Sequence, residues 1–161
     1  MKRKIVVLSM SLALAAPIAL TQIAAAQVTP AAVVAQTGSE AEMNAFYNSS
    51  YSYYDALVLG QFWGLSTSDS KAMIGFKLKM GGKAKSILGM TLGTARAKAA
   101  ADAESLNFFF KSGFDYQDAE DIAKFWGDAS VFDGKVRIER CICTGQADSV
   151  HQMLGEIRGG D

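Results

Sequence analysis

Residues 51–64 read YSYYDALVLGQFWG, and residues 114–127 read FDYQDAEDIAKFWG. The two stretches share a Tyr, an Asp-Ala pair and a Phe-Trp-Gly triplet in the same register, 63 positions apart. An Asp-x-Lys sequence follows each of them, at residues 69–71 and 133–135. A repeat of this length indicates one supersecondary unit used twice. We therefore predict an internal duplication, with one unit at about residues 46–82 and the other at about residues 109–145.

Each unit has the pattern of two helices joined by a short loop. Asp55 follows Ser52 by three residues, and Asp118 follows Asp115 by three residues. This spacing is typical of a capping box at a helix N-terminus. Apolar residues then recur at helical spacing. Gly64 and Gly127 stand where a glycine commonly ends a helix. In the first unit a further capping signal at Ser66 predicts the start of the second helix.

The remaining segments are also predicted to be helical. Residues 84–108 are rich in Ala, Leu and Lys, which favours a long helix that joins the two units, and residues 147–157 favour a short last helix. Residues 135–143 alternate in a way that favours a strand. The corresponding segment of the first unit favours a helix, and we follow the repeat. The predicted fold is a single compact all-α domain of two duplicated helix–loop–helix units joined by a long helix. We expect its core to contain Tyr53, Leu59, Phe62, Trp63, Ile74, Leu78, Phe109, Ile122, Phe125, Trp126, Ile138 and Leu154.

The start of the chain predicts export. Residues 2–4 are basic, residues 5–20 carry no charge, and residues 24–26 are alanines that precede Gln27. A basic start, an apolar stretch shorter than a membrane span and small residues at a cleavage site are typical of a secretory signal peptide. We expect a periplasmic or extracellular protein with no transmembrane span in its mature chain. The expected parts are a signal peptide at residues 1–26, a flexible leader at 27–42 and a helical domain at 43–161.

Charge is distributed unevenly along the mature chain. Its 13 Lys and Arg residues are outnumbered by 16 Asp and Glu residues, so we expect no nucleic-acid partner. From Lys71 to Lys98 there are seven basic residues and no acidic one, whereas from Asp102 to Asp133 there are eight acidic residues and two basic ones. Three interpretations stay open: complementarity between the two halves of one chain, a homo-oligomer that pairs basic with acidic halves, and a basic face for an anionic lipid or glycan.

Residues that recur in both units are candidates for a binding groove. A pair of carboxylates brought together by the duplication, Asp55 and Asp118, would be the acid–base pair of a small hydrolase. Helix capping explains both acids as well, and we prefer it. Both tryptophans are interpreted first as core residues and both lysines as solvated ones. The six candidates are Asp55, Trp63, Lys71, Asp118, Trp126 and Lys135.

Cys141 and Cys143, with His151 and Met153, form the candidate metal or redox set. The two cysteines are interpreted first as small, partly buried packing residues. In an oxidising compartment the alternatives are a disulfide, within one chain or between two, and a soft-metal site. Residues two apart on a helix point to different sides, so the predicted helix argues against a local disulfide and against chelation. We expect no cofactor, with copper or zinc as the alternative.

No motif in the chain specifies a reaction, so the sequence favours a protein that is not an enzyme. We expect an exported protein that acts by binding or by self-assembly, with a ligand that the sequence does not specify. One alternative is a redox or soft-metal-handling periplasmic protein that uses Cys141 and Cys143. The other is the small hydrolase that uses Asp55 and Asp118.

Overall fold

The computed structural model describes residues 38–159, and within that range the chain is all-helical, with no strand, as predicted. The predicted signal peptide and most of the predicted leader lie outside the described residues. The leader boundary needs a correction, because the first described helix begins at Glu40 rather than after residue 42. The α-helices are α2 (Glu40–Tyr47), α3 (Tyr53–Trp63), α4 (Thr67–Met80), α5 (Gly82–Ala101), α6 (Tyr116–Trp126), α7 (Val131–Thr144) and α8 (Ala147–Gly159), and two 3₁₀ helices are η1 (Ala103–Ser105) and η2 (Phe109–Lys111).

The boundaries of α3 and α6 follow from local capping. Ser52 and Asp55 form a full capping box at the start of α3, and Asp115 and Asp118 form the same box at the start of α6. The glycines that follow the two Phe-Trp pairs both adopt the left-handed conformation, with φ of 69° and 70°, and end these helices. The α3–α4 and α6–α7 pairs thus have the same local design, and an internal duplication is our interpretation of that correspondence.

Two further segment predictions are resolved by the structure. Residues 135–143 lie in α7 and are helical, as the repeat predicted. The predicted long helix over residues 84–108 is wrong in its second part, because α5 ends at Ala101 and two 3₁₀ helices follow. The chain leaves the helical path through Leu106, which has a positive φ of 50°.

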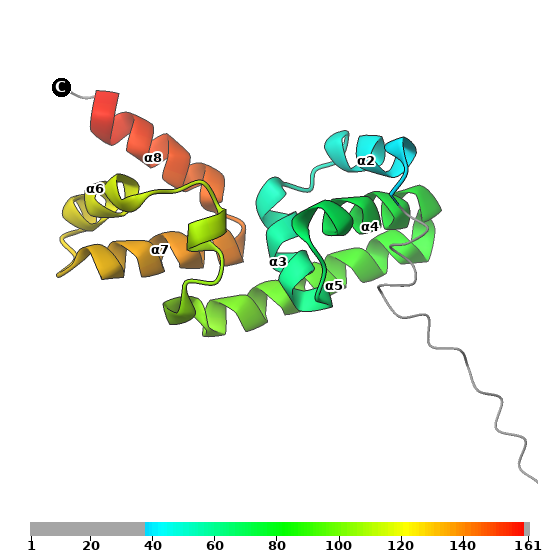
Figure 1. Ribbon diagram of the computed structural model, residues 1–161, viewed down its shortest axis with the longest axis horizontal. Helices are drawn as coiled ribbons and strands as arrows, with labels where there is room; N and C mark the ends of the chain where they lie inside the picture. The colour runs from blue at the N-terminus through cyan, green and yellow to red at the C-terminus, as the bar shows by residue number, and fades with distance from the viewer. Residues whose placement is uncertain (1–37, 160–161) are drawn as a thin grey trace, which may run out of the picture.

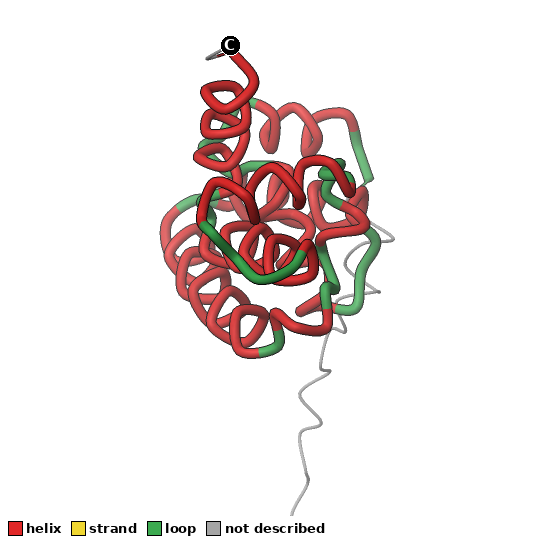
Figure 2. The backbone as a smooth tube through the Cα atoms, turned by 90° about the vertical axis from the view of Figure 1, so that its left-hand side faces the viewer, coloured by secondary structure: helices red, strands yellow, loops and turns green. Residues whose placement is uncertain are grey.

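Helices α2 to α5 form one end of an elongated molecule and α6 to α8 form the other (Figure 1). Helix α5 contacts α3 and α4, and it also contacts α7 in the other end of the molecule. It therefore connects the two ends. A view from the α6–α8 side shows the helices gathered around a common centre (Figure 2). One core cluster runs through both ends and includes Leu59, Ile74, Leu88, Ile122 and Ile138. No helix within the described residues is both long and apolar enough to cross a bilayer.

Six of the residues predicted for the core are buried: Leu59, Ile74, Phe109, Ile122, Ile138 and Leu154. The prediction is wrong for Tyr53, Phe62, Phe125 and Trp126, which are exposed. Three of these four lie in the last turn of α3 or α6, directly before the glycine at which the chain turns away. Helical spacing shows which residues share a face, but it does not show whether a neighbouring helix covers that face.

Candidate functional site

The Lys71 side chain on α4 lies among three aromatic rings. Its ammonium nitrogen is 5.0 Å from the ring centre of Tyr53 on α3, 5.4 Å from that of Tyr47 and 5.6 Å from that of Phe46. The last two rings come from the C-terminal end of α2. We call these four residues the first aromatic–lysine cluster. Each ring is close enough for its electron-rich face to attract the cation.

The second unit contains the same arrangement around Lys135 on α7. Its ammonium nitrogen is 5.5 Å from the ring centres of Phe109, Phe110 and Tyr116. These three rings lie 63 positions after the rings around Lys71, and the two lysines are 64 positions apart. We call this set the second aromatic–lysine cluster. An arrangement of four side chains from three elements therefore occurs twice in one chain.

Both clusters face solvent with large aromatic surfaces. Tyr47, Tyr53, Phe110 and Tyr116 are 62%, 41%, 72% and 60% exposed. The Tyr53 hydroxyl donates a hydrogen bond of 3.0 Å to the backbone carbonyl of Lys111, the residue after Phe110, so the two clusters adjoin. Within the described residues neither Lys71 nor Lys135 forms an ion pair with a carboxylate. Both ammonium groups therefore keep their capacity to pair with an anion.

Asp55 and Asp118, the predicted carboxylate pair, are each engaged in structural contacts. Asp55 accepts the backbone N–H of Ser52 at 2.9 Å and pairs with Arg96 at 2.6 Å. Asp118 likewise accepts the backbone N–H of its capping partner at 2.8 Å and pairs with Arg158 at 2.8 Å. Each carboxylate thus has one oxygen bound to its helix cap and the other bound to a guanidinium. The capping interpretation agrees with this geometry, and no contact in the described structure joins the two acids.

The two tryptophans have different surroundings. Trp63 is half-buried and packs against the core cluster. Trp126 is 51% exposed, and its indole N–H lies 3.3 Å from the sulfur of Met153. The guanidinium of Arg137 lies over the Trp126 ring, 4.8 Å from its centre. The structure does not place the two indoles in a shared groove.

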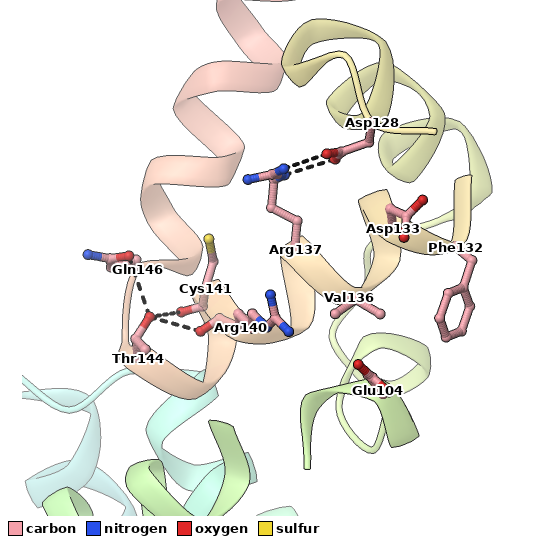
Figure 3. Close-up of a pocket in the computed structure, with 10 residues that line it drawn as sticks. All are labelled: Glu104, Asp128, Phe132, Asp133, Val136, Arg137, Arg140, Cys141, Thr144 and Gln146. Carbon is pink, nitrogen blue, oxygen red and sulfur yellow. Dashed lines mark hydrogen bonds and ion pairs between the residues drawn. The ribbon is translucent and has the colours of Figure 1, made fainter. Parts of the chain in front are cut away.

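Cys141 lines an open cavity of about 470 Å³ on the outer face of α7. Figure 3 shows its sulfur on the same side of the helix as Arg137, whose guanidinium makes two hydrogen bonds to Asp128, one of 2.9 Å. The Thr144 hydroxyl bonds to carbonyl oxygens of the helix below this thiol. The other lining residues are Glu104, Phe132, Asp133, Val136, Arg140 and Gln146.

The candidate metal or redox residues are dispersed. Both cysteines are free thiols, Cys141 is half-buried, and Cys143 is fully buried. Burial raises the pKa of both, and for Cys143 the raised pKa is about 12, with the Glu139 charge as a further cause. The His151 ring bonds to the Tyr54 hydroxyl at 2.7 Å. No group of three or more His, Cys, Asp or Glu side chains within the described residues is arranged to hold a metal ion.

Sequence reasoning found the two cluster lysines but missed their aromatic partners. A signal for them was present, since the Phe46-Tyr47 pair and the Phe109-Phe110 pair are also 63 positions apart. The Arg96 partner of Asp55 carried no such local signal, because it is 41 residues away in the chain. In comparisons with known proteins, no protein-family model, curated protein or solved structure matches this chain.

Proposed function

We propose that this is an exported protein that acts by binding rather than by catalysis, and that its ligand is an acidic polysaccharide held at the two aromatic–lysine clusters. The observation that carries the proposal is the repetition of the same arrangement around Lys71 and Lys135. In each cluster a half-buried lysine lies against one buried ring and two exposed ones. Export is part of the proposal and rests on the sequence of residues 1–26.

The chemistry of the clusters selects the ligand class. An ammonium group with no carboxylate partner attracts an anion, and an exposed aromatic ring offers a flat apolar face for stacking. A sugar ring that carries a carboxylate satisfies both requirements in one unit. Two equivalent adjoining sites also suit a polymer with repeated acidic units, because the second contact is then intramolecular and raises the overall affinity.

The contacts of the carboxylates and cysteines, the residues on which the alternative functions depend, also support the proposal. Asp55 and Asp118 are occupied by helix caps and arginines, which leaves neither free for proton transfer at a substrate. Burial keeps the thiols of Cys141 and Cys143 protonated, and the thiolate is the form that acts as nucleophile and metal ligand. These residues therefore serve the fold in our proposal.

The test is a calorimetric titration of the purified protein with oligogalacturonate, with a neutral malto-oligosaccharide of equal length as the ligand control. We expect binding of the acidic chain only. Lys71→Gln and Lys135→Gln should each weaken it about tenfold, corresponding to about 1.4 kcal/mol, and the double variant should bind more weakly than either. Lys77→Gln, on the same helix α4 but with no ring contact, is the matched control and should bind as the wild type does.

Two results would overturn the proposal. One is equal affinity of the wild type and the Lys71→Gln/Lys135→Gln double variant for the acidic chain. The other is no binding of the acidic chain together with binding to phosphatidylglycerol vesicles, which would assign the clusters to an anionic lipid surface.

A further inference from the structure

One end of the molecule combines positive charge with exposed flexible apolar side chains. The turn between α4 and α5 lies at this end (Figure 1). Met80, Ile87 and Met90 are 63%, 42% and 65% exposed there, and Lys83 and Lys85 in the first turn of α5 are also exposed. We call these five residues the basic end. Residues 38–101 as a whole carry seven basic residues against four acidic ones.

The other half of the chain carries a net negative charge, and its far end exposes aromatic rings. The turn between α6 and α7 lies there (Figure 1). Phe125, Trp126 and Phe132 are 59%, 51% and 51% exposed, and we call these three residues the aromatic end. Residues 102–161 carry twelve acidic residues against six basic ones. Internal ion pairs, such as Asp128 with Arg137, join opposite charges and so leave this net excess unchanged.

We infer that the basic end of one copy docks on the aromatic end of a second copy. The net charges are opposite in sign, so the two surfaces attract each other at long range and copies are oriented as they approach. Methionine side chains adapt their shape and make favourable sulfur contacts with aromatic rings. A contact of this kind already exists inside the chain, where Met153 meets the indole of Trp126. The interface would therefore pair Met80 and Met90 with the rings of the other copy.

The geometry also determines the kind of assembly. The two surfaces lie at opposite ends of an elongated molecule, so each docked copy leaves one free end of each type. A head-to-tail contact between different surfaces extends into a chain of copies unless its rotation closes a ring. This inference goes beyond the proposed function and uses neither aromatic–lysine cluster, so either one can fail without the other.

Sedimentation velocity of the purified protein, at increasing concentration and at salt between about 0.02 and 0.5 M, tests this inference. We expect the mean mass to rise with concentration at low salt and to fall as salt is added. Lys83→Glu/Lys85→Glu blocks the basic end, and Phe125→Lys blocks the aromatic end. Both changes are compatible with helix stability. Acidic side chains are favourable in the first turn of a helix, here α5, and a cation is favourable in the last turn, here that of α6. Ser149→Lys, an exposed change on α8, is the control and should assemble as the wild type does.

Mixing the two blocked variants distinguishes head-to-tail docking from other contacts. Each variant alone should be a monomer, because it lacks one of the two surfaces. The mixture should form dimers and nothing larger, because the intact end of each variant meets the intact end of the other. A wild type that stays monomeric at low salt and high concentration would overturn the inference. So would blocked variants that still assemble alone, or a mixture that stays monomeric.

Discussion

Glu139 is fully buried on α7 and shows how a single residue supports an irregular segment. Its carboxylate accepts the backbone N–H groups of Phe108 and Phe109, at distances from 2.6 to 3.1 Å, and so holds the start of η2. The corresponding residue of the first unit is Gly75. A Cβ atom there would overlap the backbone carbonyl of Glu42, because α2 packs directly against α4 at that point. In the second unit the carboxylate of Glu139 therefore holds the start of η2. In the first unit the absence of a side chain at Gly75 lets α2 pack against α4.

The buried carboxyl of Glu139 predicts a specific pH dependence of stability. Burial, and then the charge of Asp102, raise its pKa above the ordinary value of 4.5, against the lowering effect of the backbone hydrogen bonds. As pH rises above about 4.5 the unfolded carboxyl loses its proton first, so stability falls until pH exceeds the raised pKa. Each unit of pKa difference is worth about 1.4 kcal/mol. In Glu139→Gln this fall should disappear, as measured by urea denaturation at a series of pH values.

Glu120→Gln is the matched control for that experiment, because hydrogen bonds from Lys124 and Gln117 lower the pKa of Glu120. Its contribution to stability is therefore lost as pH falls, which is the opposite direction. Parallel curves of stability against pH for the wild type and Glu139→Gln would contradict the prediction.

At the scale of the helices, small residues allow both helix pairs to pack closely. In the α6–α7 pair a Cβ atom on Gly134 would overlap the carbonyl oxygen of Ala119 and would lie 3.1 Å from the Cβ of Ala123. In the α3–α4 pair the corresponding residues are Ser70 and Gly60, and a Cβ atom on Gly60 would lie 3.4 Å from that of Ser70. Both crossings therefore depend on residues with little or no side chain.

Substituting two glycines should separate packing from helix propensity. Gly134→Ala forces α6 and α7 apart and should destabilise the protein by about 3 kcal/mol. Gly89→Ala lies within α5 with open space around its Cβ, and should stabilise the protein by about 1 kcal/mol because alanine favours a helix. Urea denaturation of both variants measures the difference, and effects of the same sign would show that the crossing is not close-packed as described.

At the scale of the whole molecule, polar contacts connect the two ends. The Arg96 guanidinium on α5 pairs with Asp55 at the start of α3 and lies against Gly145 at the end of α7, where any side chain would overlap it. The Tyr54 hydroxyl on α3 bonds to the ring of His151 on α8 at 2.7 Å. The two ends are therefore joined by specific contacts as well as by the shared core.

The ion pair between Arg96 and Asp55 should be worth more than a surface pair, because the Asp55 side chain is only 8% exposed. Arg96→Met leaves this carboxylate buried without its partner and should cost about 3 kcal/mol of stability. In the double variant Arg96→Met/Asp55→Asn the cost should be smaller than the sum of the single costs, by about 1–3 kcal/mol. Thermal and urea denaturation of the four proteins measure this coupling, and additive costs would contradict it.

The sequence alone predicted the helical fold, the capping boxes, the glycine helix ends and the helical state of residues 135–143, because those features depend on neighbours within a turn or two. It also singled out Lys71 and Lys135 through the repeat. Only the tertiary structure decided that aromatic rings surround both lysines, since the rings come from separate elements. The same holds for Arg96 beside Asp55 and for the exposure of Phe125 and Trp126. Such contacts depend on how distant helices pack, and spacing along the chain carries no direct record of that packing.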